Sequence, residues 1–188
     1  MNDLKQLLDS YSICARFAPG FLFITSIYFL LDWDINNLKD NSILFIVLLI
    51  ILSGVCGFVS ASMIKFIERF IWNKFNNPII IYLKNKEKEL YNELLNECKE
   101  ETNIITKIKK YTWEDSKTFL KNISYGFFRN SILLSFICLY FSYFYKTHKY
   151  FYINIEICLF ILLMTFISAR YYAHQIVESY KEITLEDK

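Results

Sequence analysis

The side chains that could do chemistry in this sequence are scattered and form no catalytic pattern. Neither His148 nor His174 has an acidic or cysteine partner at metal-ligand spacing, and the five cysteines include no CxxC pair. No nucleophile with a nearby base, phosphate-binding loop or HExxH motif is present in the sequence. We therefore expect no enzyme activity, no metal site and no cofactor.

More informative are the polar residues inside long apolar segments. Residues 150–169 contain Asn154 and one charged residue, Glu156. An ionisable group at membrane depth faces a helix bundle, a cavity or an interface. Two hypotheses remain open for Glu156. Either it pairs locally with Lys146 or Lys149, or it faces the vestibule of a pore.

A stripe of small polar residues follows one face of the apolar segment 130–145. Its members are spaced by 4, 3 and 4 residues, as expected for one side of a helix: Ser131, Ser135, Cys138 and Ser142. Small residues allow close helix packing, so this face predicts a packing seam. The alternative is that the hydroxyls line a hydrated path through an oligomer.

Three arginines flank the apolar segments, namely Arg16, Arg129 and Arg170. Arginines at such boundaries usually anchor a helix to lipid head groups, and they also bind anionic ligands or carboxylates. We expect all three at the cytoplasmic surface of a membrane.

The elements that must position these residues are helices. Residues 42–64 carry no charge over 23 positions, which as a helix extends about 34 Å and crosses a bilayer. Residues 17–31, 130–145 and 150–169 are further, shorter spans. Residues 1–15 have the apolar spacing of a short amphipathic helix at the membrane surface. Small residues of the span 42–64 gather near one face and predict close helix contact: Ser53, Gly54, Gly57, Ser60 and Ala61.

Composition agrees with a membrane protein that has a water-exposed centre. Hydrophobic residues make up 54% of the 188 residues, whereas residues 65–129 hold 13 Lys or Arg and 9 Asp or Glu. A net charge of +2 gives no reason to expect a binder of duplex nucleic acid. The predicted fold is all-α, with four transmembrane helices in two hairpins and a helical cytoplasmic insert between spans 2 and 3. The corresponding parts are residues 1–64, 65–129 and 130–188.

The distribution of positive charge predicts the orientation. Two short hairpin loops hold three lysines, and the other 18 of the 21 Lys and Arg residues lie on the side of the insert and both termini. Because positive residues favour the cytoplasmic side, we expect both termini and the insert in the cytoplasm of a bacterium, with the spans in its inner membrane.

Inside the insert, Asn76, Asn77 and Pro78 predict the end of the helix that continues span 2. A second helix is expected from about residue 80 to 98, held by packing more than by ion pairs. We expect a break over residues 102–111 and a third helix from about Trp113.

Two short segments resemble signatures of a family of bacterial four-span membrane proteins with no assigned activity. The first extends from Trp72 to Pro78 and resembles W-G-G-x-P. The second, residues 122–130, resembles E-N-x-x-Y-G-F-R-R-N, with Lys121 and Phe128 in place of the signature's Glu and first Arg. The resemblance implies this four-span layout and draws attention to five residues at the junction of insert and span: Asn122, Tyr125, Gly126, Arg129 and Asn130.

Three hypotheses for function follow. The first is a homo-oligomeric pore or channel-like effector, gated by a cytosolic protein or a nucleotide at the insert and, by analogy, acting in anti-phage defence. The second is a membrane scaffold whose helix from Leu83 to Cys98 docks a soluble partner. A lipid-modifying enzyme is a third hypothesis, for which no base is recognisable.

Overall fold

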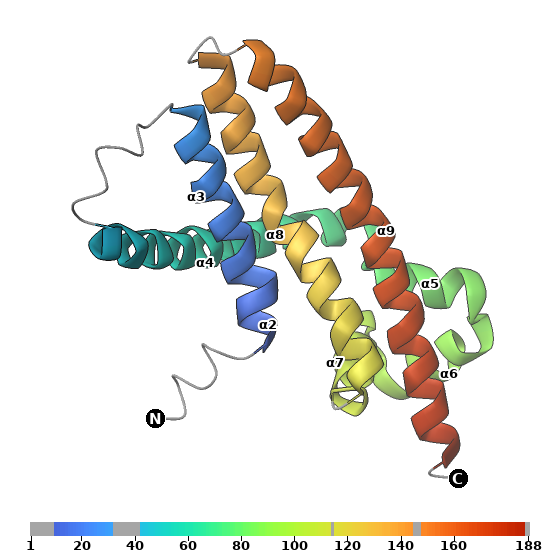
Figure 1. Ribbon diagram of the computed structural model, residues 1–188. Helices are drawn as coiled ribbons and strands as arrows, with labels where there is room; N and C mark the ends of the chain where they lie inside the picture. Colours follow the sequence, from blue (N-terminus) through green and yellow to red (C-terminus); the bar gives the residue numbers. More distant parts are fainter. Residues whose placement is uncertain (1–9, 32–41, 114, 145–147, 187–188) are drawn as a thin grey trace. The chain divides into compact units, whose positions relative to one another are not determined.

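The computed structural model describes residues 10–31, 42–113, 115–144 and 148–186, and all secondary structure in these ranges is helical. Figure 1 shows the helices α2 (Ser10–Ser12), η1 (Ile13–Phe17), α3 (Ala18–Leu30), α4 (Ser42–Phe75), α5 (Pro78–Lys86), α6 (Lys88–Cys98), α7 (Glu101–Tyr111), α8 (Ser116–Phe144) and α9 (His148–Glu186). Four segments are long and apolar enough to cross a membrane: Ser10–Leu30, Phe45–Trp72, Ser116–Phe144 and Tyr150–Leu185. The prediction of an all-helical chain with four candidate spans is confirmed. The expected surface helix over residues 1–15 lies largely outside the described residues.

The chain divides into two compact units. Unit 1 consists of Met1–Phe66 and Gly126–Thr165, and unit 2 consists of Ile67–Tyr125 and Phe166–Lys188. Helices α4, α8 and α9 each contribute one part to unit 1 and the other to unit 2. The second half of α9, which we expected to form a tail after span 4, therefore packs with the insert.

In unit 1, α8 and α9 are antiparallel. Rings of Tyr143 and Phe151 are 5.7 Å apart near one end of the pair, and those of Phe128 and Phe160 are 6.4 Å apart near the other. Figure 1 shows α3 beside the unit 1 part of α8, with the first part of α4 passing across them. An antiparallel hairpin of the first two spans is therefore not confirmed.

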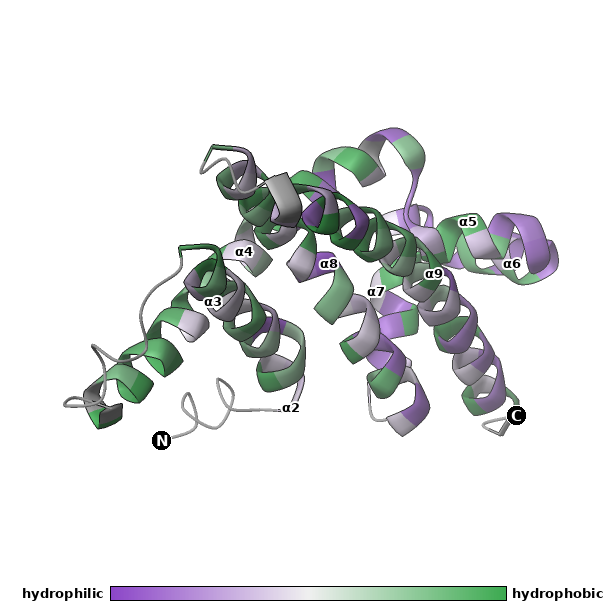
Figure 2. Ribbon diagram, turned by 45° about the horizontal axis from the view of Figure 1, so that its top comes forward, coloured by the Kyte–Doolittle hydropathy of each residue, from purple (hydrophilic) through white to green (hydrophobic). Residues whose placement is uncertain are grey.

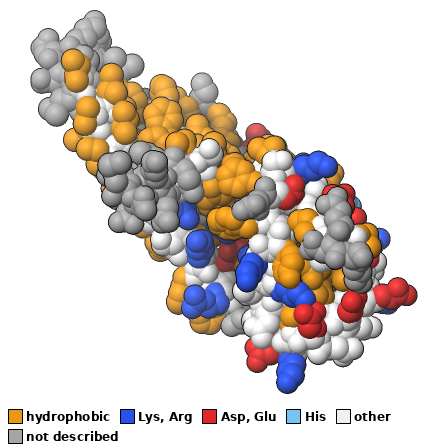
Figure 3. Space-filling model, turned by 90° about the horizontal axis from the view of Figure 1, so that it is seen from below, with side chains coloured by type: hydrophobic (Ala, Val, Ile, Leu, Met, Phe, Trp, Pro, Cys, Tyr) orange, Lys and Arg blue, Asp and Glu red, His pale blue; other side chains and the backbone are white. Residues whose placement is uncertain are grey.

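Large hydrophobic side chains cover the outside of unit 1. Examples are Phe29, Ile43 and Leu159, with 62%, 79% and 61% of their surface exposed. Figure 2 shows the same excess of hydrophobic residues along α3 and α4, and Figure 3 shows a broad area of hydrophobic side chains on one face. An apolar surface of this extent is expected where lipid replaces water.

Unit 2 has a hydrophobic core of its own. It is built from α5, α6, α7, Tyr125 of α8 and the second half of α9, with Leu83, Ile104, Ile108 and Val177 entirely buried. The helices of the insert each have one apolar face, so they bury it against one another and against α9.

Local residue chemistry explains where α4 ends and α5 begins. Asn76 has a positive φ of 66°, a conformation that asparagine tolerates better than most residues. Asn77 is extended, as the residue before a proline prefers, and its side chain accepts a hydrogen bond of 2.9 Å from the backbone N–H of Ile79. Pro78 occupies the first turn of α5, where its missing N–H costs nothing. The predicted helix end is confirmed.

Other predicted boundaries in the insert were wrong. The helix expected from about residue 80 to 98 is two helices, because the chain bends at Glu87, which has φ of −129° and ψ of 57°. The break expected over residues 102–111 is α7, whose Ile104 and Ile108 are buried one turn apart in the core. Ion pairs between elements also contribute, including Lys181 of α9 with Glu87, between α5 and α6, at 3.0 Å.

Candidate functional site

Three of the residues that the sequence singled out meet at a buried polar junction in unit 1: Gly126, Arg129 and Asn130. At its centre is Asn130 of α8, which has no exposed surface. Its side-chain amide donates a hydrogen bond of 2.6 Å to the backbone carbonyl of Ala15. This bond links α8 to the π-helix η1 at the start of the first span.

The sequence of the first span explains why this carbonyl needs a partner. In an α-helix, Ala15 would accept from the N–H of residue 19, but that residue is Pro19 and has no N–H. The chain also widens there, since the N–H of Ala18 bonds to the carbonyl of Ile13, five residues back. Because an unpaired backbone carbonyl is costly inside a membrane, the amide of Asn130 replaces the missing donor.

Gly126 lies one turn before Asn130 and allows this approach. A Cβ atom on Gly126 would be 2.9 Å from the Cβ of Ala15 and 2.8 Å from the hydroxyl oxygen of Tyr11. These distances are shorter than real contacts, so a larger residue would push η1 away from α8. The glycine of the second signature is required here for close packing.

Helix α4 also joins the junction. The hydroxyl of Ser60 donates a hydrogen bond of 2.6 Å to the backbone carbonyl of Asn130, and Ser60 is 1% exposed. Arg129, also buried, donates from Nε to Oδ1 of Asn130 at 3.2 Å. Asn130 therefore ties α8 to both η1 and α4.

The predicted small-residue face of α4 makes the other close contact. A Cβ atom on Gly57 would be 2.0 Å from the carbonyl oxygen of Arg16, and one on Gly20 would be 2.0 Å from that of Ser53. The backbones of α3 and α4 therefore touch, as the small-xxx-small pattern predicts. Gly54 differs from these two, because a Cβ there would only meet the ring of Phe17 at 3.7 Å.

Unit 2 holds a buried carboxylate that the sequence analysis missed. The hydroxyl of Tyr125 donates a short hydrogen bond to Glu68, and both side chains are less than 10% exposed. The Tyr125 ring stacks on that of Tyr172, with centroids 5.9 Å apart. The sequence pattern that could have revealed this carboxylate is its spacing along α4. Glu68 follows Ser60 and Ile64 at four-residue steps, on the buried face of the helix.

The other residues of the two signatures, Trp72, Pro78 and Asn122, belong to unit 2. Trp72 is half-buried against the hydrophobic core, and Pro78 begins α5. Asn122 is half-buried on α8.

The serine stripe of α8 is buried within unit 1. The exposed fraction is 9% or less for all four members: Ser131, Ser135, Cys138 and Ser142. The three serine hydroxyls donate to carbonyls of the preceding turn, as Ser131 does to Phe127 at 2.8 Å and Ser142 to Leu139 at 2.8 Å. This burial favours the packing alternative over the pore-lining one.

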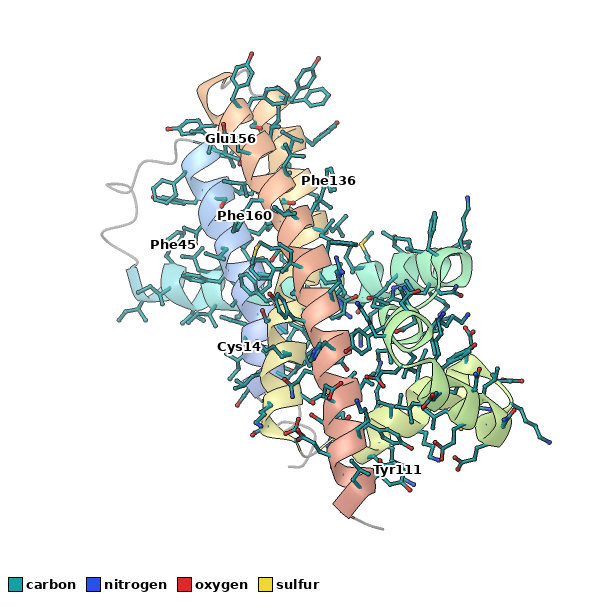
Figure 4. The ribbon with its side chains drawn as sticks, turned by 90° about the vertical axis from the view of Figure 1, so that its right-hand side faces the viewer. Cys14, Phe45, Tyr111, Phe136, Glu156 and Phe160 are labelled. Carbon is teal, nitrogen blue, oxygen red and sulfur yellow. The ribbon has the colours of Figure 1, made fainter. Side chains whose placement is uncertain are left out.

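Glu156 is placed differently. It is exposed on α9, whereas Asn154 is 9% exposed and turned into unit 1. Figure 4 labels Glu156 together with Phe160, one turn further along the same helix. The side chains of Lys146 and Lys149, the local partners that we considered, lie outside the described residues.

The arginines are not equivalent. Arg16 is half-buried in unit 1, with its guanidinium 5.4 Å from the ring centroid of Phe58 and Nη1 3.4 Å from the hydroxyl of Ser12. Arg129 is buried at the junction, whereas Arg170 belongs to unit 2 and is exposed. Among the three, Arg170 is the one most open to a ligand or a lipid head group.

Polar networks hold unit 2 together. Partial burial raises the pKa of Asp115, but hydrogen bonds from Thr118, Ser179 and the backbone N–H groups of Thr118 and Lys117 outweigh it and lower that pKa from 3.8 to about 2. Asp115 thereby caps the start of α8 and bonds to Ser179 of α9 at 2.7 Å.

A second network links α5, α6 and α7. The Lys84 ammonium and the Tyr91 hydroxyl lie 2.6 Å and 2.7 Å from one carboxylate oxygen of Glu101. Their hydrogen bonds lower the pKa of Glu101. The apolar edge of residues 83–98, which we considered as a docking face for a partner, is packed here against the core.

Comparison of the chain with protein-family models, with curated proteins and with solved structures finds no match. The resemblance of its two signatures to a four-span family stays a prediction. The described residues contain no group of three or more His, Cys, Asp or Glu side chains placed to hold a metal ion. What the structure and sequence establish is a chain with four candidate membrane spans.

Proposed function

We propose that this chain is a bacterial inner-membrane protein that assembles with copies of itself into a pore, or into the gate of a pore. Its termini and the helices of the insert lie in the cytoplasm, where the insert receives the gating signal from a protein or a nucleotide. The pore wall involves the exposed face of α9.

The observation that supports this proposal is the exposure of Glu156. It lies eight residues after His148, which is about 12 Å along the helix, and its neighbours on that face are exposed and apolar: Tyr152, Ile153, Leu159, Phe160 and Leu163. A carboxylate facing lipid costs up to about 3 kcal/mol at the bilayer centre, so such groups face protein or water. A second copy packed on this face would enclose Glu156 in a shared, hydrated path.

Flux through liposomes tests the proposal. Purified protein in vesicles loaded with potassium should release the ion, and Glu156→Gln should reduce the rate or change the preference for cations over anions. Glu182→Gln is the matched control, because Glu182 is an exposed carboxylate on the same helix but lies in unit 2. Equal effects of both variants would count against a role for Glu156.

Mass measurement in lipid nanodiscs gives the number of copies. Oligomers are expected in the wild type. A monomer in nanodiscs, together with liposomes that stay silent with and without added nucleotide, would overturn the proposal.

By analogy with effectors that permeabilise the membranes of infected cells, we place this activity in anti-phage defence. Expression of the chain in bacteria should then depolarise the inner membrane when its signal is present, measured with a voltage-sensitive dye. Cells that express Glu156→Gln should keep more of their potential.

A further inference from the structure

A cleft of about 730 Å³ opens in unit 2 between α5 and α9. Each helix contributes residues at four-residue steps, so one face of each lines it: Tyr82 and Lys86 from α5, and Phe166, Arg170 and His174 from α9. Its size is that of a site for a small molecule.

The charged residues that line this cleft are Lys86 and Arg170, and none of its described lining residues is acidic. Two carboxylates outside the lining, Glu87 and Glu178, act on Tyr82 at its edge, and Lys181 forms ion pairs with both. Within the described part of unit 2, neither Lys86 nor Arg170 forms an ion pair with a carboxylate. A third cation lies close by, because the ammonium of Lys121 is 5.7 Å from the ring centroid of Tyr171, another lining residue. An anion is therefore the favoured occupant.

The cleft also has an apolar part, formed by Ile81 and Phe166. Ile81 is 40% exposed, so it offers hydrophobic surface to an occupant. The guanidinium of Arg170 lies 5.7 Å from the ring centroid of Phe166, which brings a charge and an apolar surface together. An occupant with an anionic head and a hydrocarbon tail matches both.

The position of the cleft along α9 favours a lipid. The apolar run of residues 150–169 ends at Arg170, and the cleft is lined from Phe166 to His174, across this change from apolar to polar sequence. Phosphate head groups lie at this level in a membrane. The rings of Tyr82 and His174 are only 5.4 Å apart and tilted by 58°, which leaves no space for a flat nucleobase between them.

We propose that this cleft binds an anionic phospholipid, with the head-group phosphate on Arg170 and Lys86 and the acyl chains beginning against Ile81 and Phe166. The proposal rests on the chain being a membrane protein and does not require that it forms a pore.

The test uses the full chain, purified in detergent and stripped of lipid, with thermal unfolding as the readout. Phosphatidylglycerol should raise the melting temperature by several degrees, whereas phosphatidylcholine, inorganic phosphate and AMP should not. The double variant Lys86→Gln with Arg170→Gln should lose this shift. Lys88→Gln with Lys110→Gln is the matched control, because it removes two exposed lysine charges outside the cleft and should keep the shift.

Each other outcome overturns the proposal. An equal shift with phosphatidylcholine means that no anionic site exists, and an equal shift with phosphate or AMP assigns the cleft to a soluble anion. An undiminished shift in the cleft variant places the lipid elsewhere. If that variant fails to fold, Ile81→Trp replaces it, since it keeps both charges and fills the apolar part. This variant should then bind phosphatidylglycerol several-fold more weakly, measured by native mass spectrometry.

Discussion

At the scale of single residues, the molecule depends on polar groups placed where a helix leaves a backbone atom without its partner. Asn130 supplies the donor that Pro19 removes from the first span, and Asp115 accepts from the free N–H groups at the start of α8. Asn130 is recognisable in the sequence as a polar residue at the start of an apolar run, whereas Asp115 lies in a polar stretch and was not singled out. Their partners, Ala15 and Ser179, are far away in the chain.

Replacing Asn130 with leucine should lower the free energy of unfolding by roughly 1–3 kcal/mol, since the buried carbonyl of Ala15 loses its donor. Pro19→Ala restores an N–H four residues after Ala15. The loss caused by Asn130→Leu should therefore be smaller by about 1 kcal/mol in the Pro19→Ala background. Thermal unfolding of the four proteins in detergent measures this coupling. Strictly additive effects would show that the Asn130 amide does not replace the proline's missing donor.

Asp115 should make unit 2 sensitive to acid. Because its pKa in the folded chain, about 2, is lower than the ordinary 3.8, its carboxylate stabilises the fold above about pH 4, and this contribution disappears as the pH falls from about 4 to 2. Asp115→Asn keeps a capping side chain but removes the charge. It should therefore lower stability by roughly 1–2 kcal/mol at pH 6 and by much less near pH 2.

Melting curves between pH 2 and 6 provide the measurement for Asp115. Glu93→Gln, which changes an exposed acid on α6 beyond its first turn, serves as the control and should be neutral throughout. A deficit in Asp115→Asn that is the same at both ends of this range would contradict the assignment.

At the scale of elements, close backbone contact determines how α3 meets α4. Gly20 and Gly57 face backbone atoms at distances that no side chain tolerates, whereas Gly54, three residues before Gly57, faces the ring of Phe17 at an ordinary distance. Membrane helices lack the driving force of water exclusion between them, so such contacts carry much of their association.

The three glycines therefore give a matched comparison. Gly57→Ala and Gly20→Ala should each destabilise unit 1 by about 1–3 kcal/mol, because the added methyl group meets a backbone carbonyl that cannot rotate away. Gly54→Ala should be neutral or slightly stabilising, since alanine favours the helix. Melting temperatures in one detergent measure all three. Equal effects at the three positions would mean that α3 and α4 do not pack through this face.

At the scale of the whole molecule, each compact unit is built from two stretches that are separated in the sequence. The second half of α9 is a component of the unit 2 core, where Ile176 is 1% exposed. The second half of α9, most of which lies within the candidate span Tyr150–Leu185, thus completes a unit whose other residues are Ile67–Tyr125.

Truncating Ile176 to alanine should cost about 2–5 kcal/mol, because it leaves a cavity in that core. Leu185→Ala, at a position 71% exposed on the same helix, should change stability by less than about 0.5 kcal/mol. Protease cleavage between residues 76 and 115 should rise in Ile176→Ala alone. Were the second half of α9 a solvated tail, the two variants would behave alike.

The sequence by itself determined the helical class, the four apolar segments, the end of α4 before Pro78 and the small-residue face of α4. These properties depend on composition, on period and on single-residue backbone preferences, all of which are local. Within the insert, local patterns failed at Glu87 and over residues 102–111, where burial against other helices decided the outcome.

Only the tertiary structure decided which distant groups meet. It joined Asn130 to Ala15 and Glu68 to Tyr125, buried the serine stripe, and brought α9 into the core of the insert. The physical reason is that a sequence contains many groups that could form a hydrogen bond with a given polar side chain, and nothing local distinguishes among them. The packing of whole helix faces selects the single partner that lies within hydrogen-bonding distance.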